Sequence, residues 1–271
     1  MSVQAGATSF MSAILVISPH LDDAAFSVGP LLAEFADRAK IVVATVFTKS
    51  ELNPAGFALA CQLDKGLSAE ADYMAIRRTE DIEWSKRIGA EAAHGAFAEA
   101  PHRGYHSSKE LFGPALPTDD LEDVLTSWFL ALAQTFEPSA ILCPIGVGDH
   151  VDHVLVSKFA RTSLESKFPL FFFKDQPYAS KLNTFHVADY FGDVNAWHEL
   201  RMPLSENSLA KAQFAVEAYK SQIPFQFGDV GKMRDTLSEA WIKTSSLFYI
   251  PEKTDINDAF PLIKFNQICP V

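Results

Sequence analysis

Short runs of branched and aromatic residues alternate along this chain with longer stretches whose apolar residues recur at helical spacing. The short runs have the length of buried strands and lie at residues 14–17, 41–47, 140–144 and 171–173. Helical spacing is found from Val28 to Phe35, at residues 75–89, 119–136 and 151–165, and from Leu209 to Tyr219. This alternation predicts an α/β fold with a mostly parallel sheet, right-handed crossovers and helices on both faces.

Two parts of the chain lack a clear period. Residues 48–74 predict a long loop that overhangs the strand ends, and such a loop suits either a substrate lid or a subunit contact, so an oligomer is possible. The tail from about residue 223 has weak patterning and stays unassigned. Asp119 or Asp120 is expected to cap the helix at 119–136. Because no linker or repeat marks a boundary, we expect a single domain over residues 1–271.

Composition narrows the class of protein. Of the 271 residues, 48% are hydrophobic and 21% are charged, as in ordinary globular proteins. The formal net charge of -11 argues against a nucleic-acid binder, which needs clustered Lys and Arg. Three scattered cysteines fit a reducing compartment, and we find neither a secretion signal nor an apolar run of membrane length. We therefore expect a cytoplasmic protein without a membrane span.

Two clusters of acidic residues and histidines follow predicted strands. His20-Leu21-Asp22-Asp23 comes directly after the strand at 14–17, and His150-Val151-Asp152-His153 follows the strand at 140–144. A helix is predicted after each cluster. Ligands of open α/β sheets bind in the crevice outside the strand ends, so both clusters are expected to face one crevice. A divalent cation would compensate the adjacent carboxylates.

The residue types in these clusters suit a catalytic zinc site. Such a site takes about three His or carboxylate ligands and keeps an open position for water. We assign His20, Asp23 and His153 as ligands. Asp22 then stays free as general base, and His150 can donate a hydrogen bond or proton to the oxyanion or the leaving amine.

Asp152 is expected to hold the tautomer of His150 and to keep that imidazole charged. Structural roles are the alternatives for both clusters. An Asp at a strand–helix junction is commonly a helix N-cap, and a His after a strand is commonly hydrogen-bonded structure.

The two clusters also carry a family resemblance. Ser18-Pro19-His20-Leu21-Asp22-Asp23 resembles the P-H-P-D-D-E signature of the PIG-L/LmbE family of zinc-dependent N-deacetylases. Gly148-Asp149-His150-Val151-Asp152-His153 resembles the H-x-D-H motif of that family, in the same order. The resemblance implies a Rossmann-like fold, the same three zinc ligands and the same roles for Asp22 and His150. It also implies substrates with N-acetylated, glucosamine-type sugars.

Weaker similarity extends the resemblance to roughly residues 13–222. It runs through Arg77-Arg78-Thr79-Glu80, Ala100-Pro101-His102-Arg103, Asp175-Gln176-Pro177-Tyr178 and Ala218-Tyr219-Lys220-Ser221-Gln222. Three positions depart from the family pattern. Leu21 and Ala24 stand where the signature has Pro and Glu, and Gly148 stands where some members place a Tyr that assists the oxyanion.

Substrate-binding candidates come from these weaker segments: Arg77, Arg78, His102, Arg103, Asp175 and Tyr178. Either arginine of the pair at 77 and 78 can bind a sugar hydroxyl or an anionic group, or can instead form a salt bridge on its helix with Glu80 or Asp81. Placement on a surface loop is the alternative for His102, Arg103 and Tyr178.

The sequence thus predicts a zinc-dependent hydrolase that removes an N-acetyl or other N-acyl group from a small molecule containing an amino sugar. Two alternatives stay open. One is an amidase that acts on a larger acyl group or on a non-sugar amide. The other is a non-catalytic Rossmann-like binding module that has retained its metal ligands.

Overall fold

One mixed β-sheet forms the centre of the protein. The computed structural model describes residues 12–182, 184–192, 197–245, 247–251 and 267–270. The strand order is β3-β2-β1-β4-β5-β7-β6-β8. The parallel strands are β1 (Ala13–Ser18), β2 (Lys40–Thr45), β3 (Glu91–His94), β4 (Pro138–Pro144) and β5 (Leu170–Phe173). Antiparallel strands β7 (Leu247–Pro251), β6 (Trp197–Arg201) and β8 (Gln267–Pro270) extend one edge.

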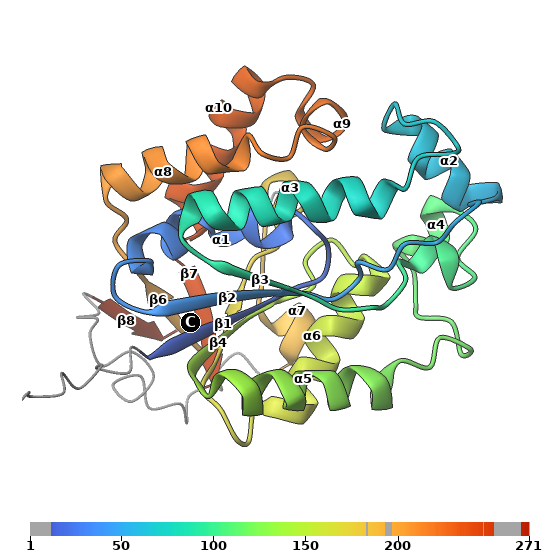
Figure 1. The fold of residues 1–271 in the computed structure, drawn as a ribbon. Helices are drawn as coiled ribbons and strands as arrows, with labels where there is room; N and C mark the ends of the chain where they lie inside the picture. Colours follow the sequence, from blue (N-terminus) through green and yellow to red (C-terminus); the bar gives the residue numbers. More distant parts are fainter. Residues whose placement is uncertain (1–11, 183, 193–196, 246, 252–266, 271) are drawn as a thin grey trace, which may run out of the picture.

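Helices cover both faces of this sheet (Figure 1). One face carries α1 (Asp23–Phe35), α3 (Tyr73–Ile88), α8 (Glu206–Val216) and α10 (Val230–Ala240). The opposite face carries α5 (Glu122–Phe136) and α6 (Val151–Leu164). Shorter helices lie in the connections: α2 (Gly56–Asp64), α4 (Ser108–Leu111), α7 (Ala188–Phe191) and α9 (Ile223–Phe227). The predicted α/β fold with a largely parallel sheet is confirmed.

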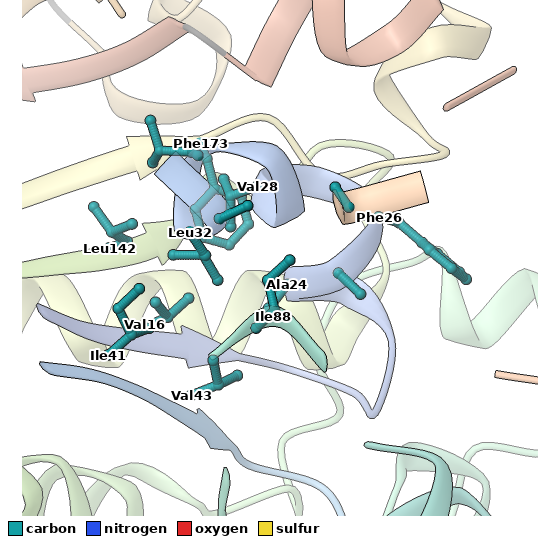
Figure 2. Close-up of a cluster of buried hydrophobic side chains, with 14 of the residues drawn as sticks. Val16, Ala24, Phe26, Val28, Leu32, Ile41, Val43, Ile88, Leu142 and Phe173 are labelled. Atoms are coloured by element: carbon teal, nitrogen blue, oxygen red, sulfur yellow. The ribbon is translucent and has the colours of Figure 1, made fainter. Parts of the chain in front are cut away.

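The strand β1 shows why the sheet needs helices on both sides. Its six residues are all buried, and they alternate between the two hydrophobic cores. Ile14 and Val16 pack under α1, whereas Leu15 and Ile17 pack toward α5 and α6. Figure 2 shows the core on the α1 side, where Val16 lies among apolar side chains from α1 and the neighbouring strands. A strand buried on both faces therefore reads as a continuous apolar run.

The strand order places a crevice beside β1. The chain moves outward from β1 to β2 and β3, and it then returns to form β4 and β5 on the other side of β1. The connections after β1 and β4 consequently leave the sheet in opposite directions. Such a switch point is where open α/β sheets bind ligands. Both acidic and histidine clusters lie there, because His20 follows β1 and His150 follows β4.

Several sequence predictions need correction. Residues 48–74 include the helix α2, so this segment is not a plain loop. The unassigned tail contains α9, α10 and strand β7. Strand β3 was not predicted because Glu91–His94 lacks branched residues and lies at a partly exposed sheet edge. Within the described part of the chain, none of the helices combines the length and the hydrophobicity needed to span a membrane.

Candidate active site

A pocket of about 270 Å³ opens at the carboxyl ends of the parallel strands. His20 after β1, Glu99 after β3 and His150 after β4 all line it. Helix α2 borders the same pocket, as expected for the segment predicted to overhang the strand ends. Residues that lie far apart in the sequence thus meet because parallel strands end at one edge of the sheet.

Three potential metal ligands meet at the floor of this pocket. The separations between His20 Nδ1, Asp23 Oδ2 and His153 Nε2 are 3.2, 3.2 and 3.3 Å. Bonds of about 2.0–2.1 Å to a tetrahedral zinc ion place neighbouring ligand atoms roughly 3.3 Å apart. The geometry therefore fits one divalent cation held by these three atoms.

The second nitrogen of each histidine is held by a carboxylate. Asp152 Oδ2 lies 2.8 Å from His20 Nε2, and Asp175 Oδ1 lies 2.7 Å from His153 Nδ1. Such partners fix the ring orientation and the tautomer that presents a lone pair to a metal. Asp175 also accepts hydrogen bonds from the backbone N–H groups of residues 146 and 147, so its carboxylate is fully occupied below the pocket.

Asp152 contacts His150 through its backbone and not through its carboxylate. Its carboxylate contacts His20, and only its backbone N–H reaches His150, where it donates to Nδ1 at 3.2 Å. The neutral tautomer of His150 therefore carries its proton on Nε2. Burial lowers the pKa of His150 to about 3, against the weaker opposing effect of Asp152, so the imidazole is neutral and not charged as predicted.

A second group of potential ligands, His20, His150 and Asp152, also lies close together. Asp152 Oδ1 is already paired with the Arg103 guanidinium at 2.7 Å. A metal ion there would meet a fixed positive charge. The group of His20, Asp23 and His153 has no such cation beside its ligand atoms in the described residues, so it is the better metal site.

Metal binding is expected to release protons. Burial would lower the pKa of His20, but hydrogen bonds to Asp152 and Asp23 outweigh it and raise this pKa to about 10 in the metal-free site. His20 is then protonated at neutral pH and must lose that proton to bind a metal. We expect the metal affinity to rise about tenfold per pH unit between pH 6 and 8. Calorimetric titration in two buffers of different ionisation enthalpy counts the protons, and a pH-independent affinity would contradict the assignment.

Arg103 connects the metal site to the loop before α5. Its guanidinium pairs with Asp152 and forms two hydrogen bonds of 2.8 and 2.9 Å with the carboxylate of Asp119. Asp119 also accepts a hydrogen bond from the buried Tyr105. The predicted capping of α5 by Asp119 or Asp120 was wrong, since Leu121 is the N-cap residue and no side chain caps this helix. Arg103 therefore supports His20 through Asp152 and does not line the pocket.

Replacing Arg103 by Gln is expected to weaken metal binding about tenfold. The change removes the charge that fixes Asp152, and partners behind a metal ligand are typically worth about 10–100-fold in affinity. Competition with a chelator measures the dissociation constant. Arg87→Gln serves as control, because Arg87 pairs with the exposed Glu83 on α3. An unchanged metal affinity together with a lower melting temperature would assign Arg103 a purely structural role.

Asp22 is buried beside the metal ligands but bonds in another direction. Arg77 donates from Nη2 to Asp22 Oδ1 at 3.1 Å and from Nη1 to Glu99 Oε1 at 2.6 Å. Arg77 thus forms ion pairs across the pocket and not along its own helix with Glu80 or Asp81. Burial raises the pKa of Asp22 to about 6, and the charge of Arg77 limits this rise. An ionised carboxylate near neutral pH suits a general base.

Tyr178 fills the space beside Gly148. A Cβ atom at position 148 would lie 2.7 Å from the Cβ of Tyr178, and Gly148 has a φ of +90°. A side chain at position 148 is therefore excluded while Tyr178 occupies this place. The Tyr178 ring packs 5.3 Å from the ring of His153, and this residue lines the pocket. Tyr178 thus places a phenol group beside the site. This tyrosine comes from the loop after β5, and not from position 148, where some members of the family place a Tyr.

Four of the six substrate-binding candidates do not line the pocket, and Arg103 and Asp175 instead support the histidines as described above. Arg78 donates hydrogen bonds to the Thr48 carbonyl and to Ser50, which fixes the start of the segment that leads to α2. His102 is exposed and does not line the pocket. Of the six candidates, the structure brings only Arg77 and Tyr178 to the pocket wall.

Sequence reasoning also missed pocket residues. Glu99, Tyr73, Lys65 and Phe112 line the pocket but stand in segments without a motif. The signal for Glu99 was its place directly before Ala100-Pro101-His102-Arg103. Lys65 and Phe112 gave no signal, because each is a single residue directly after a short helix, and only the fold brings them to one pocket.

Comparison with known proteins identifies the family. The sequence profile described as PIG-L, GlcNAc-PI de-N-acetylase, matches residues 15–164, which is more than half of the chain. The chain belongs to the PIG-L family. This confirms the predicted family, and the matched residues include both histidine clusters.

Several relatives in this family carry deacetylase names. The 2'-N-acetylparomamine deacetylase of Streptomyces fradiae is 33% identical over 175 residues, which cover 64% of this chain and 60% of the relative. That of Niallia circulans is 27% identical over 269 residues, which cover 89% of this chain and 91% of the relative.

Solved structures agree with this family fold. A zinc-inhibited form of teicoplanin deacetylase superposes with a TM-score of 0.74 at 22% identity. The match covers 90% of this chain and 100% of the teicoplanin deacetylase. The A40926 pseudoaglycone deacetylase superposes with a TM-score of 0.71 at 26% identity. This match covers 89% of this chain and 97% of that deacetylase.

Proposed function

We propose that this PIG-L family protein is a zinc-dependent N-deacetylase that hydrolyses the N-acetyl group of a small molecule containing an amino sugar. The observation that carries the proposal is the cluster of His20 Nδ1, Asp23 Oδ2 and His153 Nε2 within 3.3 Å of one another, with a buried carboxylate, Asp22, adjacent to it. Two nitrogens and one oxygen are a donor set that suits zinc. The names of the relatives supply the substrate class.

The residues around the proposed metal support hydrolysis of an amide. A bound zinc ion would polarise the substrate carbonyl and lower the pKa of a water to roughly 7. Asp22 takes a proton from the attacking water and later transfers it to the leaving nitrogen. Arg77 holds Asp22 in place and favours its ionised form, and Glu99 binds the other side of the Arg77 guanidinium. The neutral His150 donates from Nε2 to the carbonyl oxygen as negative charge develops there.

Acetate release tests the proposal. We would load the purified protein with up to one equivalent of zinc and offer 2'-N-acetylparomamine and N-acetylglucosamine as probes. Zinc should be titrated from below one equivalent, because one solved relative is described as a zinc-inhibited form. We expect acetate and a free amine in equal amounts from at least one probe. Metal-loaded protein that releases acetate from neither would contradict the proposed activity.

We also propose that the protein works in the cytoplasm. Cys61 and Cys143 are free thiols, and Cys143 is fully buried as a small core residue. Free thiols are typical of a reducing compartment. Cell fractionation with a tagged chain would test this location, and recovery of the protein outside the cytoplasmic fraction would contradict it.

A further inference from the structure

The pocket has two walls of different chemistry on either side of the catalytic cluster. One wall begins at His150 and consists of Leu111 at the end of α4 and Phe112 directly after it, and the other begins at Asp22 and runs along α3 to α2 and α9. Figure 1 shows α2 and α4 at the same side of the molecule. An amide substrate also has two arms, the acyl group and the amine-bearing ring, so the walls can distinguish them.

The wall at His150 is aromatic and apolar. The Phe112 ring lies 5.4 Å from the ring of His150 and 6.0 Å from that of Tyr178, edge to face in both cases. Leu111 is buried next to it. Sugar hydroxyls placed against these side chains would lose hydrogen bonds to water without replacement, whereas an acyl chain would not.

The wall at Asp22 is polar and continuous. Arg77 links Asp22 to the Tyr73 ring, over which its guanidinium carbon lies at 5.2 Å. The Lys65 ammonium lies 5.2 Å from the same ring and 4.8 Å from the ring of Phe225 on α9. Among the described residues, no carboxylate forms an ion pair with Lys65, which donates a hydrogen bond to the Cys61 carbonyl at 3.1 Å. Its remaining N–H groups are available to the oxygens of a ring resting on Phe225.

The chemistry of amide hydrolysis orients the substrate independently. The water oxygen forms a bond to the carbonyl carbon while one proton passes to Asp22. The C–N bond then breaks as the nitrogen takes up this proton, and the products separate as a carboxylate and an amine. Because Asp22 is both the acceptor and the later donor, the nitrogen must lie on the Asp22 side of the pocket. The acyl group then extends toward His150 and Phe112.

We propose that Phe112 limits the length of the acyl group and that Lys65 and Phe225 hold the amine-bearing ring, so that the enzyme selects short acyl groups on a hydroxylated ring. This inference rests on the proposed deacetylase function. Phe112 is 45% exposed, so it is the outermost part of its wall. Its truncation opens the pocket toward solvent and gives a longer acyl chain a place to extend.

The test compares acyl chain lengths. We would measure kcat/KM for the N-acetyl, N-butyryl and N-hexanoyl forms of whichever probe sugar the wild type cleaves faster. Wild type is expected to prefer acetyl over hexanoyl by roughly a hundredfold or more. Phe112→Ala is expected to raise the hexanoyl-to-acetyl ratio at least tenfold, because each misfitting methylene in an apolar pocket costs roughly tenfold or more. Phe214→Ala, an exposed phenylalanine on α8 outside the pocket, is the control and should leave the ratio unchanged.

Lys65→Met provides the second arm of the test. It is expected to raise KM for the acetylated sugar severalfold and to leave the acyl preference unchanged. An unchanged ratio in Phe112→Ala with a wild-type melting temperature would overturn the orientation, as would a change of acyl preference in Lys65→Met. Wild type that cleaves hexanoyl as fast as acetyl would overturn the limit set by Phe112. Wild type that cleaves no N-acyl sugar at all would instead overturn the proposed function.

Discussion

His153→Ala protein is expected to be purified without bound metal and to release no acetate from N-acetylated sugars. The substitution removes one of the three proposed ligand atoms, and it also removes the imidazole that lies 2.7 Å from the buried Asp175 carboxylate. With only His20 and Asp23 left, the site has too few ligands for a stable catalytic ion. Elemental analysis by mass spectrometry measures the metal per chain. Wild type should hold about one equivalent and the variant close to none.

The matched control for this experiment is His102→Ala. His102 is exposed and contributes nothing to the pocket wall, so its removal should leave the metal content unchanged. A thermal melt gives a second reading, since a ligand that binds only the folded state raises stability by about 4 kcal/mol at a thousandfold excess over its dissociation constant. Zinc should stabilise wild type and His102→Ala but not His153→Ala. Full metal occupancy in His153→Ala would show that the ion is held by other residues.

Asp22→Asn is expected to lower kcat by about 10²–10⁴-fold while the metal stays bound. An amide has nearly the same shape as the carboxylate and can still accept a hydrogen bond from Arg77, but it cannot take a proton from water. Asp22 is not one of the three atoms that surround the metal position, so the ligand set remains intact. Acetate release under saturating substrate measures kcat, and elemental analysis measures the retained metal.

The control for Asp22→Asn is Asp37→Asn, an exposed position just beyond the far end of α1. It tests whether the loss of one negative charge near this helix changes turnover by itself. Activity of Asp22→Asn equal to wild type would remove Asp22 from the proposed mechanism. Loss of metal in this variant would instead give Asp22 a role in binding the ion.

The sequence predicted the central elements because their local pattern and their tertiary burial agree. Each of the runs at 14–17, 41–47, 140–144 and 171–173 overlaps a strand of the parallel sheet, although β2 ends at Thr45, since a strand covered on both faces is apolar at most positions. Strand β3 and helix α9 were missed because a four-residue edge strand and a five-residue helix carry weak periodicity. The single-domain organisation stays a prediction.

The proximity of His20, Asp23 and His153 was predictable because each lies close in sequence to a strand end. Two local motifs, each after a strand, sufficed to select His20, Asp23 and His153. The partners of those residues were not predictable in the same way. Asp152 was assigned to its sequence neighbour His150, yet its carboxylate contacts His20, which is 132 positions away. Asp119 was assigned to a helix cap, yet it binds Arg103 across a loop.

By itself, the sequence determined the alternation of strands and helices, the two motifs at strand ends and the family, because these depend on local spacing. Only the tertiary structure decided which carboxylate supports which histidine, that Arg77 faces Asp22 and Glu99, and that Phe112 and Lys65 form separate walls of one pocket. These pairings depend on strand order and on the directions in which loops leave the sheet. The type of a residue does not indicate which distant helix, strand or loop will lie beside it in the folded protein.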